Sequence, residues 1–379
     1  MNGGMELYLH MPFCVRKCAY CDFLSFPTDQ ETQNLYTRRL REDIDAMGKK
    51  YGDIPVDTIF IGGGTPSVPD SALIVGIMEH VRKAFHVAEG AEISMEANPG
   101  TVTREKLTDY RKAGINRLSF GLQSANDREL KLLGRIHTWA EFLESFTLAR
   151  ECGFTNLNID LMSALPGQTC ESWKETLSRV TDLDPEHISA YSLIIEEGTP
   201  FGERYGSEEG RKLLPDEDSE REMYHETKRF LKDCGYERYE ISNYAKPGRE
   251  CRHNIGYWTG VPYLGLGLGA SSYLDGCRFT VNPDMKQYLE EKPGMFADIE
   301  KLTKKDMEEE FFYVGLRMTA GVSLSEFERR FGISAKEVYP GLMETFVKEK
   351  AARFEGDRFV LTDYGLDVSN YIMAQFLQD

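Results

Sequence analysis

Three cysteines stand close together near the start of the chain. Cys14, Cys18 and Cys21 have three and then two residues between them, in the run Cys-Val-Arg-Lys-Cys-Ala-Tyr-Cys. This spacing is too short for structural disulfides, but soft thiolates crowded into one loop can converge on the irons of an iron–sulfur cluster. Three ligands for a four-iron cube leave one iron open, which favours chemistry or sensing over plain electron transfer. A zinc site is the alternative; such sites usually pair two halves, and the sequence offers no second half.

The charge of the chain limits its partners. Among 379 residues, 62 acidic side chains outnumber 45 basic ones, for a formal net charge of −17. Nucleic acids and anionic membranes attract basic surfaces, so we expect no nucleic-acid partner. The sequence has no signal pattern and no run of about 18 apolar residues, so we expect a cytoplasmic protein without a transmembrane segment. Peripheral membrane association and a homodimer stay open.

Six short apolar runs alternate with helical stretches in the first half of the chain. The runs cover residues 6–10, 56–61, 92–96, 117–123, 156–162 and 187–193. Such alternation predicts an α/β fold with a parallel sheet and right-handed crossovers. In these folds functional residues gather in the loops that follow the strands. The alternation alone is compatible both with a partial barrel and with an open doubly wound sheet.

The rest of the chain changes character twice. We assign residues 1–235 to this α/β domain with a trailing helical segment, whose acidic stretch from 196 we expect to be a solvated face. Residues 236–300 are glycine-rich and predict short strands whose backbone approaches a ligand closely. Residues 301–379 contain helical runs followed by a hairpin pattern over 353–362, which predicts a smaller α+β, winged-helix-like domain. Because the chain is acidic, we interpret this domain as a packing or substrate-covering module.

The cysteine spacing, with Tyr20 just before the last cysteine, resembles the signature of the radical S-adenosylmethionine (SAM) superfamily. The resemblance implies an incomplete (β/α)6 barrel over about residues 1–195. It also implies a 4Fe–4S cluster on the three cysteines, with SAM bound at the open iron. Reduction of the cluster would then cleave SAM to a 5'-deoxyadenosyl radical.

A glycine loop, Gly62-Gly-Gly-Thr-Pro66, follows the second apolar run. Glycines after a strand occur wherever a tight turn is needed, so the loop alone is a weak signal. Its position one βα unit after the cysteine loop lets bare backbone contact the amino group and methionine moiety of SAM. We expect Gly63, Gly64 and Thr65 to make these contacts.

Nearly the whole chain is similar to the coproporphyrinogen III oxidase-like group of this superfamily. The similarity rests on Tyr8, Glu96, the run Gly121-Leu-Gln-Ser, Arg135 and Asp160, with the loop just described. It implies that Tyr8 packs beside the cluster and that Glu96 and Gln123 hydrogen-bond SAM. It further implies that Arg135 pairs with the SAM carboxylate and Asp160 with a ribose hydroxyl, which suits both side chains chemically. Helix capping or ion pairing is the alternative for each residue.

Three features separate an oxidase from a heme chaperone within this group. The oxidase carries a further cysteine two residues after the third, where this chain has Phe23. It also has an extended segment ahead of the cysteine loop, whereas thirteen residues precede Cys14 here. Third, the Cys-Asp-Phe run and His253-Asn-Ile-Gly-Tyr-Trp258 resemble the HemW type, which is regarded as a heme chaperone.

The His253 motif makes chemical sense as a heme site. Imidazole can ligate heme iron, and the aromatic Tyr257 and Trp258 can cover a porphyrin face. A hydrogen-bonded core histidine is the alternative, and Cys251 is a weaker candidate ligand. We predict a radical SAM-type chaperone that carries heme as cargo to apoproteins, with no catalytic residue assigned. The alternatives are an oxygen-independent coproporphyrinogen III oxidase and another tetrapyrrole-modifying radical SAM enzyme.

Overall fold

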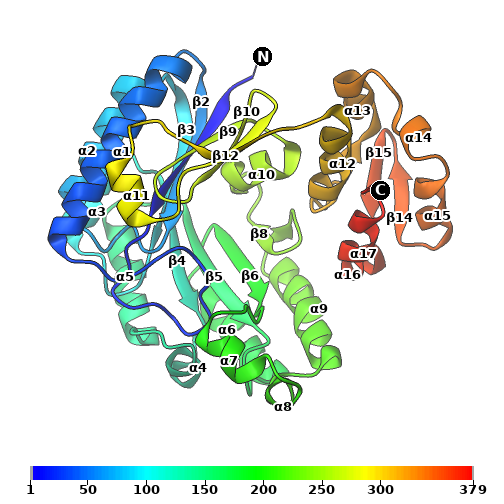
Figure 1. Ribbon diagram of the computed structural model, residues 1–379. Helices are drawn as coiled ribbons and strands as arrows, with labels where there is room; N and C mark the ends of the chain where they lie inside the picture. Colours follow the sequence, from blue (N-terminus) through cyan, green and yellow to red (C-terminus); the bar gives the residue numbers. More distant parts are fainter. Residues whose placement is uncertain (1–2, 378–379) are drawn as a thin grey trace.

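The computed structural model describes residues 3–377 and is built around one curved sheet (Figure 1). Six parallel strands form its centre and pair in chain order. They are β1 (Met5–Met11), β2 (Val56–Gly63), β3 (Val87–Ala97), β4 (Arg117–Gln123), β5 (Leu157–Ser163) and β6 (His187–Ser192). Each coincides with one of the six apolar runs, so the predicted parallel sheet is confirmed.

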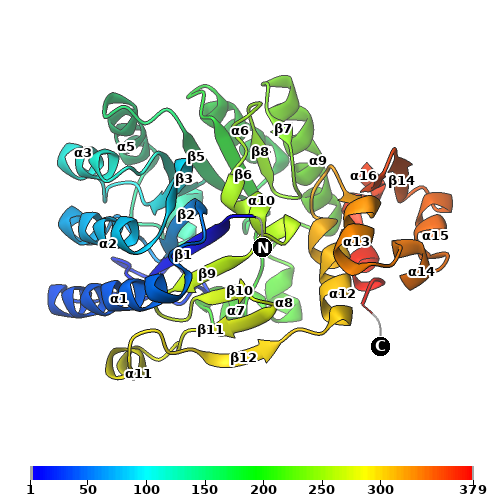
Figure 2. The same cartoon turned by 90° about the horizontal axis from the view of Figure 1, so that it is seen from above.

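Helices follow these strands, and the longer ones cover the convex side of the sheet (Figure 2). They are α1 (Gln30–Tyr51), α2 (Ser71–Ala84), α3 (Arg104–Lys112), α4 (Asp127–Leu132), α5 (Trp139–Glu151) and α6 (Cys170–Thr181). A doubly wound sheet reverses its strand order and carries helices on both faces. The order here does not reverse, which excludes that alternative and confirms the incomplete barrel.

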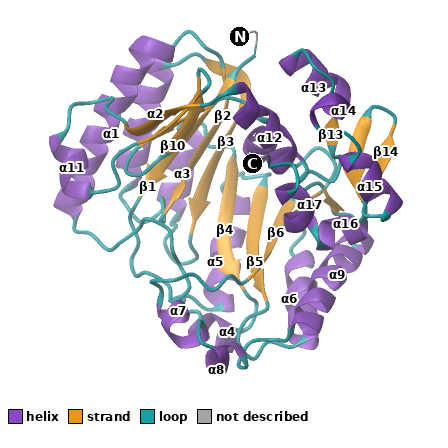
Figure 3. Cartoon of the chain, turned by 45° about the vertical axis from the view of Figure 1, so that its right-hand side comes forward, coloured by secondary structure: helices purple, strands orange, loops and turns teal. Residues whose placement is uncertain are grey.

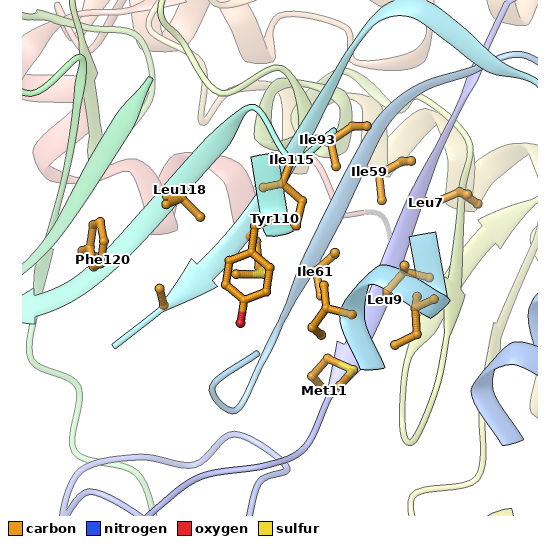
Figure 4. Close-up of a cluster of buried hydrophobic side chains, with 14 of the residues drawn as sticks. Leu7, Leu9, Met11, Ile59, Ile61, Ile93, Tyr110, Ile115, Leu118 and Phe120 are labelled. Carbon is orange, nitrogen blue, oxygen red and sulfur yellow. The ribbon is translucent and has the colours of Figure 1, made fainter. Parts of the chain in front are cut away.

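The two faces of the barrel strands differ in polarity because successive side chains point to opposite sides. In β1, Leu7, Leu9 and Met11 are fully buried against the outer helices. Figure 4 shows them with equivalent side chains of the neighbouring strands. The intervening residues, such as Tyr8 and His10, face the interior of the barrel. The outer face therefore supplies the hydrophobic core, and the inner face carries polar chemistry.

The barrel sheet continues beyond its six central strands. Three helices follow β6: α7 (Pro200–Tyr205), α8 (Glu208–Arg211) and α9 (Glu217–Asp233). The later strands are β7 (Glu237–Arg238), β8 (Asn243–Ala245), β9 (Tyr263–Leu266), β10 (Ser271–Leu274), β11 (Cys277–Thr280) and β12 (Ala297–Lys301), with α11 (Met285–Glu290) before the last. They extend the sheet to twelve strands with β12 and β7 at its edges, which leaves the barrel unclosed.

The run that contains His253 is a helix, α10 (Arg252–Thr259), although short strands were expected throughout this segment. The helix lies on the concave side of the sheet (Figure 2). Its N-cap residue, Cys251, makes no side-chain cap hydrogen bond, so no local capping pattern reveals it. Within residues 3–377 no helix is long and apolar enough to cross a membrane.

A second, smaller domain follows β12 and has its own core (Figure 3). Its sheet is antiparallel, in the order β13 (Val322–Ser323), β15 (Arg358–Leu361), β14 (Ala352–Glu355). Its helices are α12 (Lys304–Gly315), α13 (Leu324–Phe331), α14 (Ala335–Val338), α15 (Leu342–Lys348), α16 (Asp363–Asp367) and α17 (Ser369–Ala374). Helices with a small sheet confirm the predicted α+β domain. The three-part division at residues 235 and 300 stays a prediction.

Candidate cofactor and ligand site

The cysteine loop leaves the C-terminal end of β1, where the barrel opens. Cys14, Cys18 and Cys21 are half-buried, free thiols. The loop is held by its backbone: the Ala19 N–H donates to the Leu133 carbonyl at 3.1 Å, and the Phe201 N–H donates to the Ala19 carbonyl at 2.9 Å. Elements after β4 and β6 therefore fix the position of the loop.

The surroundings of the thiols suit an iron–sulfur cluster. Arg135 Nη1 donates to Cys18 Sγ at 3.5 Å, and Cys14 Sγ lies 3.6 Å from Thr65 Oγ1. A cation and a hydroxyl beside the sulfurs stabilise thiolate charge, as ligands of iron require. Across the described residues 3–377, no three His, Cys, Asp or Glu side chains are grouped to hold a single metal ion. Three soft donors on one anchored loop fit a cluster ligand set.

The glycines after β2 bring that strand's end against the cysteine loop. The Gly64 N–H donates to the Met11 carbonyl at 2.8 Å, and the Thr65 N–H donates to the Phe13 carbonyl at 2.6 Å. A Cβ on Gly64 would stand 2.6 Å from the Phe13 carbonyl oxygen. Gly63 has a φ of 112°, and a Cβ there would stand 2.4 Å from the His10 ring. Close packing therefore requires both glycines, and their contact with SAM stays a prediction.

Glu96 and Arg135 both lie close to this loop. Glu96 Oε2 accepts a hydrogen bond from the Gly63 N–H at 2.9 Å. Burial, and then the nearby Asp160, raises the pKa of Glu96 to about 7. Arg135 Nη2 donates to Asn98 Oδ1 at 2.7 Å, while its buried Nε has no hydrogen-bond partner. The guanidinium thus keeps a donor available for an anionic ligand such as a carboxylate.

Two further predicted SAM contacts lie on neighbouring strands, Gln123 at the end of β4 and Asp160 in the middle of β5. Gln123 has a φ of 75°, a left-handed conformation that is uncommon for a residue with a side chain. Asp160 accepts hydrogen bonds from Ser119 Oγ and Asn158 Nδ2, each at 2.8 Å. Burial raises the pKa of Asp160 despite these bonds. Both residues stay predictions as SAM ligands.

A cavity of about 210 Å³ inside the barrel brings several predicted residues together. Its lining includes Tyr8, Glu96, Asp160, His253 and Tyr257. Arg135, Thr65 and Cys18 share a second hollow nearer the cysteine loop. The structure therefore divides the predicted site into a cluster-side group and an interior group.

His253 is a buried, hydrogen-bonded side chain with 1% exposure. Its Nδ1 lies 2.7 Å from Thr58 Oγ1 and its Nε2 lies 3.0 Å from the Tyr257 hydroxyl. Burial lowers the pKa of His253 to about 3, so the ring is neutral. Both ring nitrogens are engaged, and ligation of iron through Nε2 would require Tyr257 to move away. The assignment of His253 as a heme ligand stays a prediction.

The N-terminus of α10 is capped from a distant strand. Glu92 on β3 accepts hydrogen bonds from the Arg252 N–H at 3.1 Å and from the His253 N–H at 3.3 Å. It also accepts one from the Cys251 thiol at 3.4 Å. Burial raises the pKa of Cys251 to about 12, so this thiol stays protonated and is not poised as a thiolate ligand.

Several charged residues of the interior escaped the sequence reasoning. Arg117 on β4 is 2% exposed, lines the 210 Å³ cavity and has a buried Nε without a partner. Glu6 on β1 is 2% exposed, and burial raises its pKa to about 9. A signal existed: polar residues stand at every second position in 6–10 and 92–96, and also in 117–123 except at Gly121. Such a period-two pattern places them on one face of each strand.

Comparison with known proteins decides the family. A sequence profile of the Radical SAM superfamily matches residues 8–180, and one of the HemN C-terminal domain matches residues 302–368. Heme chaperone HemW of Bacillus subtilis (strain 168) is 35% identical over 374 residues, which cover 98% of each chain. The chain belongs to the HemW family of the radical SAM superfamily. Membership of this superfamily implies a 4Fe–4S cluster and SAM.

Other relatives of this HemW family member agree. Heme chaperone HemW of Escherichia coli (strain K12) is 35% identical over 387 residues, covering 99% of this chain and 98% of the relative. Among solved structures, coproporphyrinogen III oxidase (HemN) from Escherichia coli, a radical SAM enzyme, superposes with a TM-score of 0.86 at 25% identity. The match covers 99% of this chain and 90% of that one. This chain therefore has the same overall fold as that oxidase.

A larger cavity, of about 1000 Å³, lies between the barrel and the C-terminal domain of this HemW family member. Tyr257 and Trp258 of α10 lie on its barrel side, and α12 and α13 supply the other side. Tyr8 and Tyr257 line both this cavity and the smaller one inside the barrel. These two tyrosines thus stand between the small cavity inside the barrel and the larger one. His253 lines only the small cavity.

Proposed function

We propose that this protein is a heme chaperone that binds heme and delivers it to apoproteins. The observation that carries the proposal is the full-length similarity to proteins named heme chaperones, joined to the position of helix α10. That helix places His253, Tyr257 and Trp258 where the barrel interior meets the larger cavity. Imidazole and aromatic faces are the groups that proteins use to hold heme.

The cysteine loop supports the same choice. Phe23 stands where the oxidases have a further cysteine, and its side chain is 67% exposed. A thiol is therefore lacking at that point of the loop. The chain would hold the cluster through Cys14, Cys18 and Cys21, and SAM through Glu96, Gln123, Arg135 and Asp160. When bound, the cluster and SAM supply one-electron chemistry.

Anaerobic titration of the reconstituted protein with heme tests this function. We expect one heme per chain, followed by the Soret absorbance. His253→Ala tests the iron ligand separately: a shifted Soret band with weaker binding supports His253, and an unchanged band assigns the iron to another ligand. His80→Ala is the matched control, since His80 is a half-buried histidine on α2 paired with Asp45. Absence of stoichiometric heme binding by the wild-type chain would reject the function.

The HemN likeness favours a second candidate, the oxidative decarboxylation of coproporphyrinogen III. Its test is porphyrin formation in the presence of SAM and a low-potential reductant.

We also propose a cytoplasmic location. The net charge of −17 suits a soluble carrier, and all eight cysteines are free, as a reducing compartment maintains them. Cell fractionation with an antibody against the chain tests the location. A homodimer and peripheral membrane contact stay predictions.

A further inference from the structure

The geometry points to the cavity between the barrel and the C-terminal domain as the heme site, with the heme propionates bound by Arg330 and Arg358. This inference rests on the proposed function and adds where and how the cargo is held. Size is the first argument. Pockets for ligands of this class have volumes of roughly 300–1,000 Å³. The interior cavity beside His253 has about 210 Å³, whereas the interdomain cavity has about 1000 Å³.

The shape of the lining is the second argument. Aromatic rings form the barrel side of the cavity, where Tyr257 and Tyr263 pack edge-to-face at 4.7 Å. The opposite side, from α12 and α13, carries Met307, Phe311 and Phe331 among its lining residues. Two apolar walls on different domains suit a flat hydrophobic ligand between them. Thioethers such as that of Met307 are also known ligands of heme iron.

Charge is the third argument. The charged residues that line the cavity are four cations, Arg278, Lys304, Arg330 and Arg358, against two carboxylates, Glu310 and Glu326. The cavity is therefore positive by two charges in a chain whose formal net charge is −17. A ligand with two negative charges would neutralise such a cavity, and the two propionates of heme carry two negative charges.

The two arginines proposed as propionate partners come together through the local structure. Arg358 on β15 donates to the carbonyls of Ala320 and Gly321, each at 2.6 Å. Ser323 pairs with Arg358 in the sheet and caps α13, the helix that carries Arg330. Arg330 donates through Nε to Glu326 at 2.6 Å and through Nη2 to the Thr259 carbonyl at the end of α10, at 3.2 Å. Arg330 thus stands where α10 meets the C-terminal domain, and Arg358 lines the same cavity.

Trp258 offers a further donor at this junction. Its Nε1 is buried without a hydrogen-bond partner, and Arg317 stacks on its ring at 4.4 Å. An unpaired indole N–H beside the arginines can donate to a propionate oxygen.

The experiment compares iron protoporphyrin IX with its dimethyl ester, which keeps the ring and loses both negative charges. With the reconstituted full chain, we expect the diacid to bind about tenfold more tightly or better. The double variant R330Q/R358Q should lose this preference while its affinity for the ester stays unchanged. Arg329→Gln is the matched control: Arg329 neighbours Arg330 on α13 and also pairs with Glu326, but it does not line the cavity.

The outcomes separate the inference from the proposed function. One-to-one heme binding without diacid preference, with R330Q/R358Q equal to R329Q, places heme elsewhere and overturns the inference while the function stands. Failure of the wild-type chain to bind heme removes both. If the double variant does not fold, the single variants R330Q and R358Q are each compared with R329Q in the same assay. A reduced diacid preference in either single variant supports this cavity, and preferences equal to that of R329Q overturn it.

Discussion

At the scale of single residues, the barrel interior concentrates buried ionisable groups. Glu6 packs against Gly256 of α10, where a Cβ would stand 1.9 Å from Glu6 Oε1. Its Oε2 has no hydrogen-bond partner. Burial in this position favours the neutral carboxyl, since a carboxylate here would lose its hydration. Helix α10 and strand β1 therefore meet through a protonated acid.

Replacing Glu6 with glutamine tests this protonation state. Its pKa rises from an ordinary 4.5 to about 9, so the stability gained from the protonated form is complete below pH 4.5. That stability is lost as the pH rises through about 9. We expect Glu6→Gln to match the wild type near pH 5 and to exceed it by about 1–3 kcal/mol at pH 8.5. Urea unfolding at both pH values measures this, with Glu89→Gln on the exposed start of β3 as control.

Glu96 predicts a pH dependence of SAM binding. Its pKa of about 7 means that the carboxyl becomes a carboxylate between pH 6 and 8. A carboxylate attracts the cationic amino group and sulfonium of SAM, so we expect affinity to rise several-fold over this range. Glu96→Gln should bind SAM weakly and without that rise. Anaerobic calorimetry at pH 6 and 8 measures both, and a wild-type affinity that is independent of pH would contradict the assignment.

Some of these residues could be predicted from the sequence, whereas their contacts with distant segments could not. Cysteine spacing predicted the loop at Cys14, and alternation could have indicated Arg117, because period two assigns a strand face. What local sequence does not contain is the distance between strands. The contact of Gly64 with the Phe13 carbonyl and that of Arg135 with Cys18 join segments 51 and 117 positions apart. Only the assembled barrel defines them.

At the scale of elements, α10 shows where local patterns fail. The run from Arg252 to Thr259 contains glycine, asparagine and aromatic residues, which are moderate to poor helix formers. Its cap comes from Glu92, about 160 residues earlier in the chain, rather than from a neighbouring side chain. The six barrel strands, by contrast, were predictable because alternation of apolar runs and helices is a local pattern.

Removal of the distant cap should loosen α10. Glu92→Ala leaves the backbone N–H groups of Arg252 and His253 without their acceptor. We expect a loss of about 1–3 kcal/mol in the free energy of unfolding, with reduced amide protection in α10. Glu89→Ala, on an exposed position of the same strand, should change stability by less than about 0.5 kcal/mol. Equal effects of the two substitutions would show that the cap is unimportant.

Helix α7 covers the cysteine loop, which revises the expectation of a solvated face over the stretch from 196. Its acidic residue Glu203 is exposed, but Phe201 and Tyr205 are buried in a cluster with Leu133, and the tilted rings of Phe201 and Tyr20 lie 6.4 Å apart. Phe201→Ala should lower the free energy of unfolding by about 3–5 kcal/mol. It should also make the iron–sulfur cluster decay faster in air. The decay of cluster absorbance measures this, with Leu213→Ala, on an exposed side chain after α8, as control. Equal decay rates in the two variants would contradict the covering role.

At the scale of the whole molecule, the two domains enclose a space that neither holds alone. Helix α10 contacts α12 directly, and Arg278 of β11 forms an ion pair with Glu310 of α12 at 2.7 Å. From the sequence, we interpreted the C-terminal domain as a packing or substrate-covering module. Its helices form one side of the larger cavity. The cavity itself was not predictable, because its walls come from segments joined only by tertiary packing.

The central claim is that this radical SAM protein carries a tetrapyrrole rather than converting one. One anaerobic sample of reconstituted protein, containing SAM, a low-potential reductant, heme and coproporphyrinogen III, tests it most directly. The account predicts one heme bound per chain by its Soret absorbance, and unchanged coproporphyrinogen by mass spectrometry. Decarboxylated product without stoichiometric heme binding would contradict it.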